Sequence, residues 1–384
     1  MISIVDKKDC VGCNACGQIC PKVCIDMRAD VQGFLYPSVN LSECIDCHLC
    51  EHVCPVLHQN SPRNPVAVIA AKNKDSEKKL NSSSGGVFFA LGAKIISEGG
   101  VVFGARFDHE WSVVHDYTED LAGLSAFQGS KYSQSRIGDS FKAAENFLRN
   151  GRKVMFTGTP CQLAALQLYL RRDYGDSLLK VEIVCHGVPS PESWRSYLDY
   201  VSGKHGCGSV SGISFRDKRR GWDCYGLSIG FKSKNGCKTE MYEPAETNLF
   251  METFLRDFNI RPSCSACPAK CGKSHSDITL GDFWGIRLVR PELYDGMGVS
   301  AVMSYTAEAL AELKSNSSLE WHDADYGDVL RRNPSIENSA TLPADYETFW
   351  EAYRSGGWSA CASFIARLRP SLFKRIIHRF KRQR

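Results

Sequence analysis

The sequence lacks the features of a protein that enters or crosses a membrane. It has no apolar segment near its start that would act as an export signal. It also has no run of about eighteen uncharged apolar residues, the length that a membrane-spanning helix needs. We therefore expect a chain without a membrane span, located in the cytoplasm.

Acidic residues are missing from the end of the chain. Residues 367–384 hold eight lysines and arginines and no aspartate or glutamate, whereas the formal net charge is only +4, so the other 366 residues carry −4. A mildly acidic body gives no reason to expect a nucleic-acid partner. The tail places its apolar residues on one helical face, namely Leu372, Phe373, Ile376, Ile377 and Phe380. This basic amphipathic helix lies on an anionic membrane surface, docks on a partner, or packs on its own domain.

Cysteine, in contrast, is abundant and unevenly placed. Of eighteen cysteines in 384 residues, nine precede residue 55 and three lie between residues 264 and 271. Close clusters of this kind are typical of metal ligands in a reducing compartment rather than of a secreted disulfide scaffold. An apolar content of 43% in a chain of this length supports two or three domains with their own cores.

The first sixty residues contain one cysteine motif twice. Each copy reads C-x2-C-x2-C-x3-C-P, the bacterial ferredoxin pattern that holds a 4Fe-4S cluster. Because the fourth cysteine of each copy ligates the other cluster in such pairs, we expect one cluster on Cys10, Cys13, Cys16 and Cys54. The second is expected on Cys44, Cys47, Cys50 and Cys20. A double zinc ribbon is the alternative, but zinc sites rarely combine this spacing with Cys-Pro. Cys24, outside the pattern, is expected to be a small core residue.

Two stretches of small residues follow a proline-containing linker at residues 60–66. Ser82-Ser83-Ser84-Gly85-Gly86 lies between a predicted buried strand, 66–71, and a helical run that starts at residue 87. Such a helix start either binds an anion or is capped by serine in the ordinary way. Residues 101–107 and 111–115 are predicted to be paired strands. The second stretch, Gly129-Ser130-Lys131-Tyr132, either brings a lysine to a phosphate or is a solvated loop.

From residue 150 the pattern changes to strand, loop and helix. Residues 153–157 form a predicted strand, and Thr159 and Pro160 fit the start of a helix that contains Cys161. The pattern recurs with a strand at 181–184 followed by Cys185. Both cysteines then lie just beyond the carboxyl ends of adjacent strands, where open α/β sheets bind ligands. The alternative for each is a buried cysteine that only fills space.

Two further segments carry chemistry. Residues 216–222, between predicted antiparallel strands at 212–215 and 227–231, hold four basic residues and form either a phosphate or dinucleotide loop or a solvated hairpin. Cys264 and Cys267 form a C-x2-C pair, with Cys271 close by. In a reducing protein such a pair is a metal or redox site. Residues 276–285 are predicted to be a strand that ends in a glycine turn.

Taken together, these segments resemble the coenzyme F-420 hydrogenase/dehydrogenase beta-subunit family, in its bacterial form with a fused ferredoxin domain. The resemblance rests on the two ferredoxin motifs and on residues 82–86, 129–132, 158–162, 185–191, 264–267 and 276–285, in the family's order. It implies a flavin, FAD, within residues 66–335 and a third 4Fe-4S cluster. The candidate ligands of that cluster are Cys161, Cys185, Cys264 and Cys267, with Cys271 as a possible replacement for Cys185. The candidate flavin contacts are Ser83, Ser84, Gly85, Gly86, Gly129, Ser130, Lys131 and Tyr132.

We expect an α+β or α/β fold, in which a small bacterial-ferredoxin domain precedes a mixed α/β domain that binds flavin and iron–sulfur. The expected parts are a ferredoxin domain at 1–60, a flavin-binding region at 66–145, a region with the third cluster at 150–335, and an extension with the basic helix at 336–384.

The expected function is that of a flavin-dependent iron–sulfur oxidoreductase. It would move electrons between a small-molecule two-electron donor or acceptor, such as the deazaflavin coenzyme, and ferredoxin or another redox protein. A non-catalytic electron-transfer subunit of a larger complex is the main alternative. A disulfide reductase that uses Cys264 and Cys267 as its redox pair is a further one.

Overall fold

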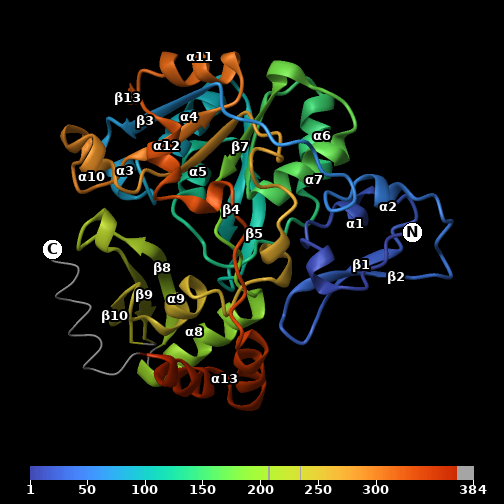
Figure 1. Ribbon diagram of the computed structural model, residues 1–384, viewed down its shortest axis with the longest axis vertical. Helices are drawn as coiled ribbons and strands as arrows, with labels where there is room; N and C mark the ends of the chain where they lie inside the picture. The colour runs from blue at the N-terminus through green and yellow to red at the C-terminus, as the bar shows by residue number, and fades with distance from the viewer. Residues whose placement is uncertain (206–207, 234, 370–384) are drawn as a thin grey trace.

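A computed structural model describes residues 1–205, 208–233 and 235–369. The described chain forms three sheets, with eight, three and two strands (Figure 1). The mixed α/β class expected from the sequence is confirmed. None of the helices in the described residues combines the length and the apolar character that a membrane span requires. The predicted basic helix of the tail lies almost wholly outside the described residues.

The large sheet orders its strands β13-β3-β12-β11-β7-β6-β4-β5. Its centre, from β11 through β7 and β6 to β4, is parallel, and antiparallel pairs extend it on both sides. The strands are β3 Ala67–Asn73, β4 Val101–Phe107, β5 Val113–Thr118, β6 Val154–Gly158, β7 Leu178–Ile183, β11 Ile278–Asp282, β12 Ser300–Ser304 and β13 Leu319–Asp323. Strands from the predicted 66–145 and 150–335 regions thus share one sheet.

Helices cover both faces of this sheet, because alternate strand residues point to opposite sides. Met155 packs in a buried cluster with residues of α4, α5 and α11, whereas Val154 and Phe156 pack with α6 and α7. A third buried cluster adds α10 and α12. These helices are α4 Val87–Ser97, α5 Leu121–Phe127, α6 Ser140–Arg149, α7 Pro160–Leu170, α10 Ile286–Val289, α11 Ala307–Ser315 and α12 Tyr326–Leu330, and the short α3 Ser76–Leu80 follows β3.

A separate lobe lies below the large sheet in Figure 1. It consists of the antiparallel sheet β10-β9-β8 and three helices, and its core is rich in aromatic side chains. Its elements are α8 Pro191–His205, β8 Ser209–Asp217, β9 Gly226–Lys232, β10 Lys238–Pro244, α9 Leu249–Leu255 and α13 Tyr346–Leu368. Helix α13 is broken at Gly356 and Gly357, whose backbone angles are not helical.

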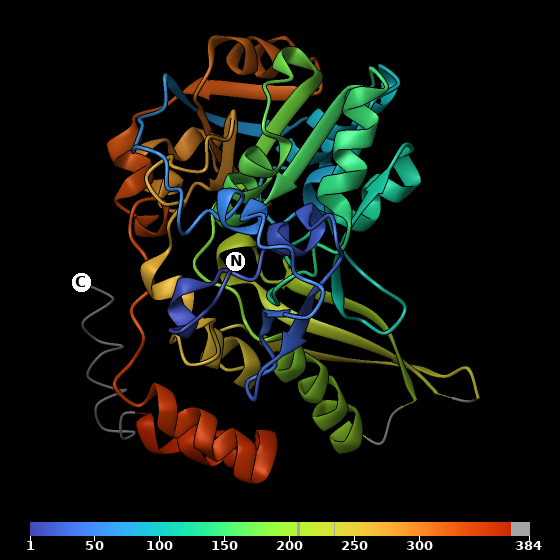
Figure 2. The same cartoon turned by 90° about the vertical axis from the view of Figure 1, so that its right-hand side faces the viewer.

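The first sixty residues form a small region that contacts both the sheet and the lobe (Figure 2). Its elements are η1 Lys7–Asp9, α1 Ala15–Ile19, β1 Ile25–Ala29, β2 Leu35–Val39 and α2 Leu49–His52. The sequence repeat of 34 residues reappears in the backbone, since Asn14 and His48 both have positive φ, 58° and 60°. Short 3-10 helices elsewhere are η2 Gly175–Ser177, η3 Trp222–Cys224, η4 Pro262–Ala266, η5 Pro291–Leu293 and η6 Pro334–Ile336.

Most strands and helices predicted around the motifs are present. The paired strands predicted at 101–107 and 111–115 are β4 and β5, although β5 starts two residues later because the turn runs through Trp111, at φ 63°. Helix α7 begins as expected, with Thr159 as N-cap and Pro160 in the first turn. The run 216–222 is not a plain loop, because Arg216 and Asp217 end strand β8.

Candidate metal centres

The eight ferredoxin-motif cysteines fall into two groups. The inner set is defined as Cys10, Cys13, Cys16 and Cys54. It lies on the side of the ferredoxin region that faces the body of the protein, meaning the large sheet and its helices, since Cys13 shares a buried cluster with residues of α6 and α7. Burial and the neighbouring charges of Cys10 and Cys54 raise the pKa of Cys16 to about 12. Burial, followed by the charge of Cys16, also raises the pKa of Cys13. These buried thiols are hard to ionise without a nearby cation, and their charges affect one another. Both properties are expected of thiols that ligate one shared cluster.

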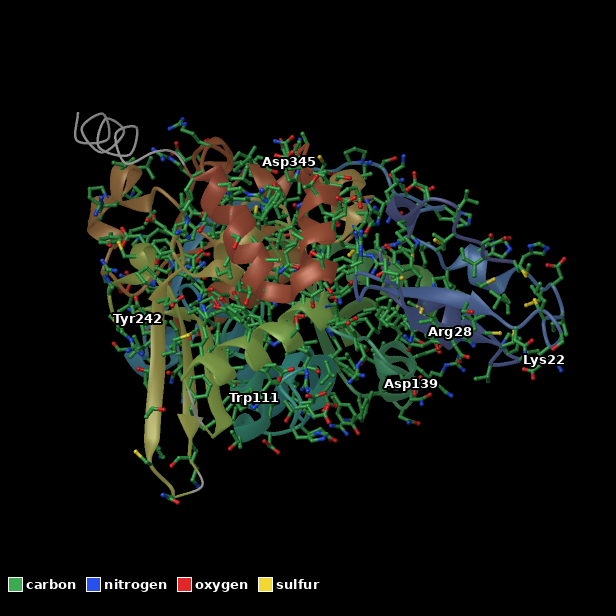
Figure 3. All side chains as sticks on the ribbon, turned by 90° about the horizontal axis from the view of Figure 1, so that it is seen from below. Lys22, Arg28, Trp111, Asp139, Tyr242 and Asp345 are labelled. Atoms are coloured by element: carbon green, nitrogen blue, oxygen red, sulfur yellow. The ribbon has the colours of Figure 1, made fainter. Side chains whose placement is uncertain are left out.

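The outer set is defined as Cys20, Cys44, Cys47 and Cys50. These four cysteines line one cavity together with Pro21 and Ile45. The Ile2 amide donates a hydrogen bond of 3.2 Å to the Cys50 sulfur. Lys22 marks the end of this region that is farthest from the body (Figure 3), and Cys47 is exposed. Cys24, expected in the core, is buried, and its sulfur lies 3.4 Å from that of Cys20.

A third group of thiols, the dispersed set, comes together from distant parts of the chain. Its members are Cys161, Cys185, Cys264 and Cys267, and all four line one cavity. Cys161 follows β6 and Cys185 follows β7, which are parallel neighbours in the sheet. Burial raises the pKa of each of Cys161, Cys185 and Cys264 to about 12, and charges on other thiols of the set add to the rise.

Cys271 points elsewhere. Its sulfur donates a hydrogen bond of 3.2 Å to the Glu337 carbonyl. It does not line the cavity of the dispersed set. The arrangement therefore groups Cys185, rather than Cys271, with the other three thiols.

Two buried cations face the dispersed set. Lys270 donates to the Cys185 and Ser335 carbonyls, and it lowers the pKa of Cys185 and Cys267 against the larger effect of burial. Arg261 acts in the same way on Cys161 and Cys264. In the described residues neither cation forms an ion pair with a carboxylate within 4 Å. Four thiols and two unpaired cations fit an anionic 4Fe-4S cluster.

No three His, Cys, Asp or Glu side chains of the described residues are arranged to hold a single metal ion. A 4Fe-4S cube makes no such demand, because each of its four corner irons takes one thiolate.

The two predicted flavin stretches also meet. The Ser83 hydroxyl lies 2.7 Å from that of Ser130 and accepts a hydrogen bond of 2.6 Å from the Ser130 amide. The Tyr132 hydroxyl accepts a hydrogen bond from Arg216 at 3.4 Å. Residues 83–86 and 129–132 are thus joined into one surface beside strand β8.

Several of the predicted flavin contacts have partners within the protein. Ser84 donates to the Val299 carbonyl, and the Gly85 amide donates to the Ser300 hydroxyl. The Lys131 ammonium donates to the Ala126 and Gln128 carbonyls, at the end of α5. Gly86 is the N-cap of α4, with φ 82°. The other side chains of these stretches are Ser83 and Ser130, which contact each other, and Tyr132, which contacts Arg216. These three are therefore the remaining candidates for flavin contacts.

Two basic residues of the run 216–222 reach this surface. The sequence marked the run as a candidate phosphate or dinucleotide loop but did not distinguish these two residues from the others. Arg216 pairs with Asp282 at 3.0 Å and stacks on the Tyr225 ring at 3.8 Å, and its Nε has no partner. Lys218 donates to the carbonyls of Lys79, Ser84 and Met297. The other half of the run is solvated, since the exposed Arg219 pairs with Asp217 and Glu240. Alternation along β8 could not have found Arg216, because the strand register shifts between Ser214 and Asp217 and the adjacent Phe215 is buried as well.

The fold and the thiol sets define an iron–sulfur protein of the electron-transfer type. Residues 9–57 match the model of a 4Fe-4S dicluster domain. Residues 151–325 match the model of the family described as the C-terminal part of the beta subunit of coenzyme F420 hydrogenase/dehydrogenase. The resemblance inferred from the motifs is therefore confirmed.

No curated protein matches the chain. Among solved structures, the chain is similar to one from the xenon-derivatised F420-reducing [NiFe] hydrogenase complex of Methanosarcina barkeri. That match has 18% identity and a TM-score of 0.47, and it covers 76% of this chain and 94% of the other.

Proposed function

We propose that this protein is an iron–sulfur flavoprotein oxidoreductase that uses three 4Fe-4S clusters. In this proposal electrons pass between a small-molecule two-electron substrate at a flavin and a protein partner at the ferredoxin end. The observation that carries the proposal is that the dispersed set shares its cavity with Val11, which lies between two ligands of the inner set. Three ligand sets in succession form a path from the body to the surface.

A flavin completes this path because it exchanges two electrons with an organic substrate and single electrons with a cluster. The surface that joins Ser83, Ser130 and Tyr132 supports a place for it. The buried Arg216, whose charge is shared with Asp282, has an Nε without a partner among the described residues, and a flavin phosphate can accept a hydrogen bond from it. The Arg216 guanidinium also lies 5.0 Å from the ring of Trp284, which stacks on Trp222 with ring centroids 4.8 Å apart. FAD is the proposed form, and the deazaflavin coenzyme is one candidate substrate.

A redox-protein partner is proposed for the outer end of the path. Large apolar side chains are exposed around the outer set, including Val23 at 80% and Ile45 at 58%. Exposed apolar residues beside an accessible cluster suit a docking partner such as another ferredoxin. The same observation favours the second candidate function, a non-catalytic relay inside a larger complex.

The proposal is tested by anaerobic purification of the full chain, followed by iron and flavin analysis. We expect about twelve irons per chain, from three cubes, and bound FAD. The sample should also show three reducible clusters by electron paramagnetic resonance. About eight irons without flavin would contradict the proposal. Twelve irons without any turnover of a two-electron substrate by the isolated chain would instead favour the relay.

The compartment proposed is the cytoplasm. All the described cysteines are free thiols rather than disulfides, and a reducing environment keeps clusters and thiols in that state.

A further inference from the structure

Arg261 connects the inner set to the rest of the molecule through its side chain. The side chain is fully buried. Its Nε donates to the Cys10 carbonyl at 2.8 Å, and its Nη2 donates to the Leu35 carbonyl at 2.9 Å. Its Nη1 donates to Gln134 Oε1 at 3.1 Å. All three partners are neutral oxygens.

The backbone of the same residue is attached to the dispersed set. The Arg261 carbonyl accepts a hydrogen bond of 2.9 Å from the Cys264 amide, and its own amide donates to the Val188 carbonyl at 3.0 Å. A path of covalent bonds and two hydrogen bonds therefore runs from Cys10 through Arg261 to Cys264.

The contact with the inner set requires a glycine. A methyl group on Gly12 would lie 2.7 Å from Nη1 of Arg261, closer than carbon and nitrogen can approach. Gly12 also has φ 68°, which disfavours other residues. The glycine in the first C-x2-C interval thus lets the guanidinium lie directly against the ligand loop.

The charge of Arg261 has no anionic partner among the described side chains. Within residues 1–205, 208–233 and 235–369, no carboxylate lies within 4 Å of the guanidinium. The Tyr36 ring, 4.3 Å from the guanidinium carbon, compensates only in part. A buried charge without compensation is costly, so a negative charge that arrives with a cofactor is the natural counterpart. A 4Fe-4S cube with four thiolates carries such a charge.

We propose that Arg261 is the positioning residue between the inner and dispersed clusters, which it serves both as shared counter-charge and as bridge for electron transfer. One electron leaves the reduced cluster on one set and enters the oxidised cluster on the other, and no bond is made or broken. The positive charge stabilises the more negative, reduced state of both clusters and so raises both reduction potentials. This inference rests on the proposed third cluster.

The test is a redox titration of the anaerobically purified full chain, followed by electron paramagnetic resonance, with dithionite as reductant. Arg261→Gln should lower the reduction potential of each of the two clusters by about 59 mV. For one electron, this shift corresponds to a decrease of about tenfold in the equilibrium constant for reduction. Arg261→Lys, which keeps the charge, should move them much less. Gln134→Glu keeps Arg261 and places a carboxylate beside the guanidinium, although it gives up the hydrogen bond of 2.9 Å that Gln134 Nε2 donates to the Val11 carbonyl. In protein that keeps its full iron content, this neutralised guanidinium should lower both potentials in the same direction.

Arg63→Gln is the matched control, because Arg63 also donates to backbone carbonyls, those of Gly272 and Ser276. It should leave the potentials unchanged. If Arg261→Gln loses iron or fails to fold, Gln134→Glu decides. Twelve irons with unmoved potentials in Gln134→Glu would overturn the role of Arg261 and leave the proposed function intact. Eight irons in the unaltered protein would overturn both.

Discussion

At the residue scale, Cys185 and Cys271 are two candidates for one ligand position. Cys185 lines the cavity with three other thiols, whereas Cys271 donates to the Glu337 carbonyl. We therefore expect Cys185→Ser to remove the third cluster and to lower the iron content from about twelve to about eight per chain. The matched variant Cys271→Ser should keep twelve. Iron analysis of both variants decides, and the opposite pattern would assign the ligand to Cys271.

His115 offers a test by pH. It is buried between the Ser135 hydroxyl and the Thr157 carbonyl, and burial lowers its pKa to about 4. An unfolded histidine, with a pKa near 6.5, binds a proton below that pH while the folded one does not, so stability falls as the pH decreases from about 6.5 towards 4. Between pH 7.5 and 5 the loss should be about 2 kcal/mol.

Thermal or denaturant unfolding of the anaerobic protein across that range measures this loss. His115→Gln should remove about 2 kcal/mol of the pH dependence. Replacement of the exposed His109, whose side chain is 89% accessible, should leave the dependence as it is. Equal slopes for the His115 variant and the unaltered protein would show that another group is responsible.

Residue types and spacing select the candidate thiols but not their neighbours. The C-x2-C-x2-C-x3-C-P repeat and the strand-end positions of Cys161 and Cys185 are local patterns. Arg261 and Lys270 could not be singled out, because the position of each side chain is fixed by hydrogen bonds to carbonyls more than sixty residues away in sequence. Lys131 shows the reverse case, since its spacing suggested a phosphate contact whereas its ammonium is bound to the end of α5.

At the scale of elements, the start of α7 fixes where Cys161 lies. Gln162 accepts a hydrogen bond from the Thr159 amide at 3.0 Å and donates one to the Ser135 hydroxyl at 2.9 Å. Gln162→Leu should therefore cost about 1–3 kcal/mol of stability, because two polar groups lose their partner. It should also lower the occupancy of the third cluster.

Gln167→Leu, the same change on the same helix, is the control. Gln167 accepts only from Lys180, so its loss should leave the iron content unchanged. Melting temperature and iron per chain are the two measurements. Full iron content in the Gln162 variant would mean that the helix start does not position Cys161.

The order of the strands lay beyond local prediction. Strand β3 was expected as a buried strand, yet its place between β12 and β13 depends on segments about 230 and about 250 residues further along the chain. The parallel pair β6 and β7 was predictable, because successive strand–helix units place their strands side by side.

At the scale of the whole molecule, the ferredoxin region is joined to the body by an apolar contact. Val11, Ala15 and Val53 belong to the same buried cluster as Phe141 and Leu163 of helices α6 and α7. The interior around the outer set is small by comparison, and cysteine supplies much of it. A region of sixty residues with so small a core depends on its metal for stability.

Removal of the clusters should therefore unfold this region before the body. We expect trypsin to cut the cluster-free protein first at exposed sites such as Lys22 and Arg28, and to leave a fragment that begins near residue 60 and retains the eight-stranded sheet. The intact protein should resist under the same conditions, because the folded region and its contact with α6 and α7 protect the backbone. Mass spectrometry of timed digests identifies the fragments. Simultaneous digestion of the body would show that the apolar contact makes both parts one cooperative unit.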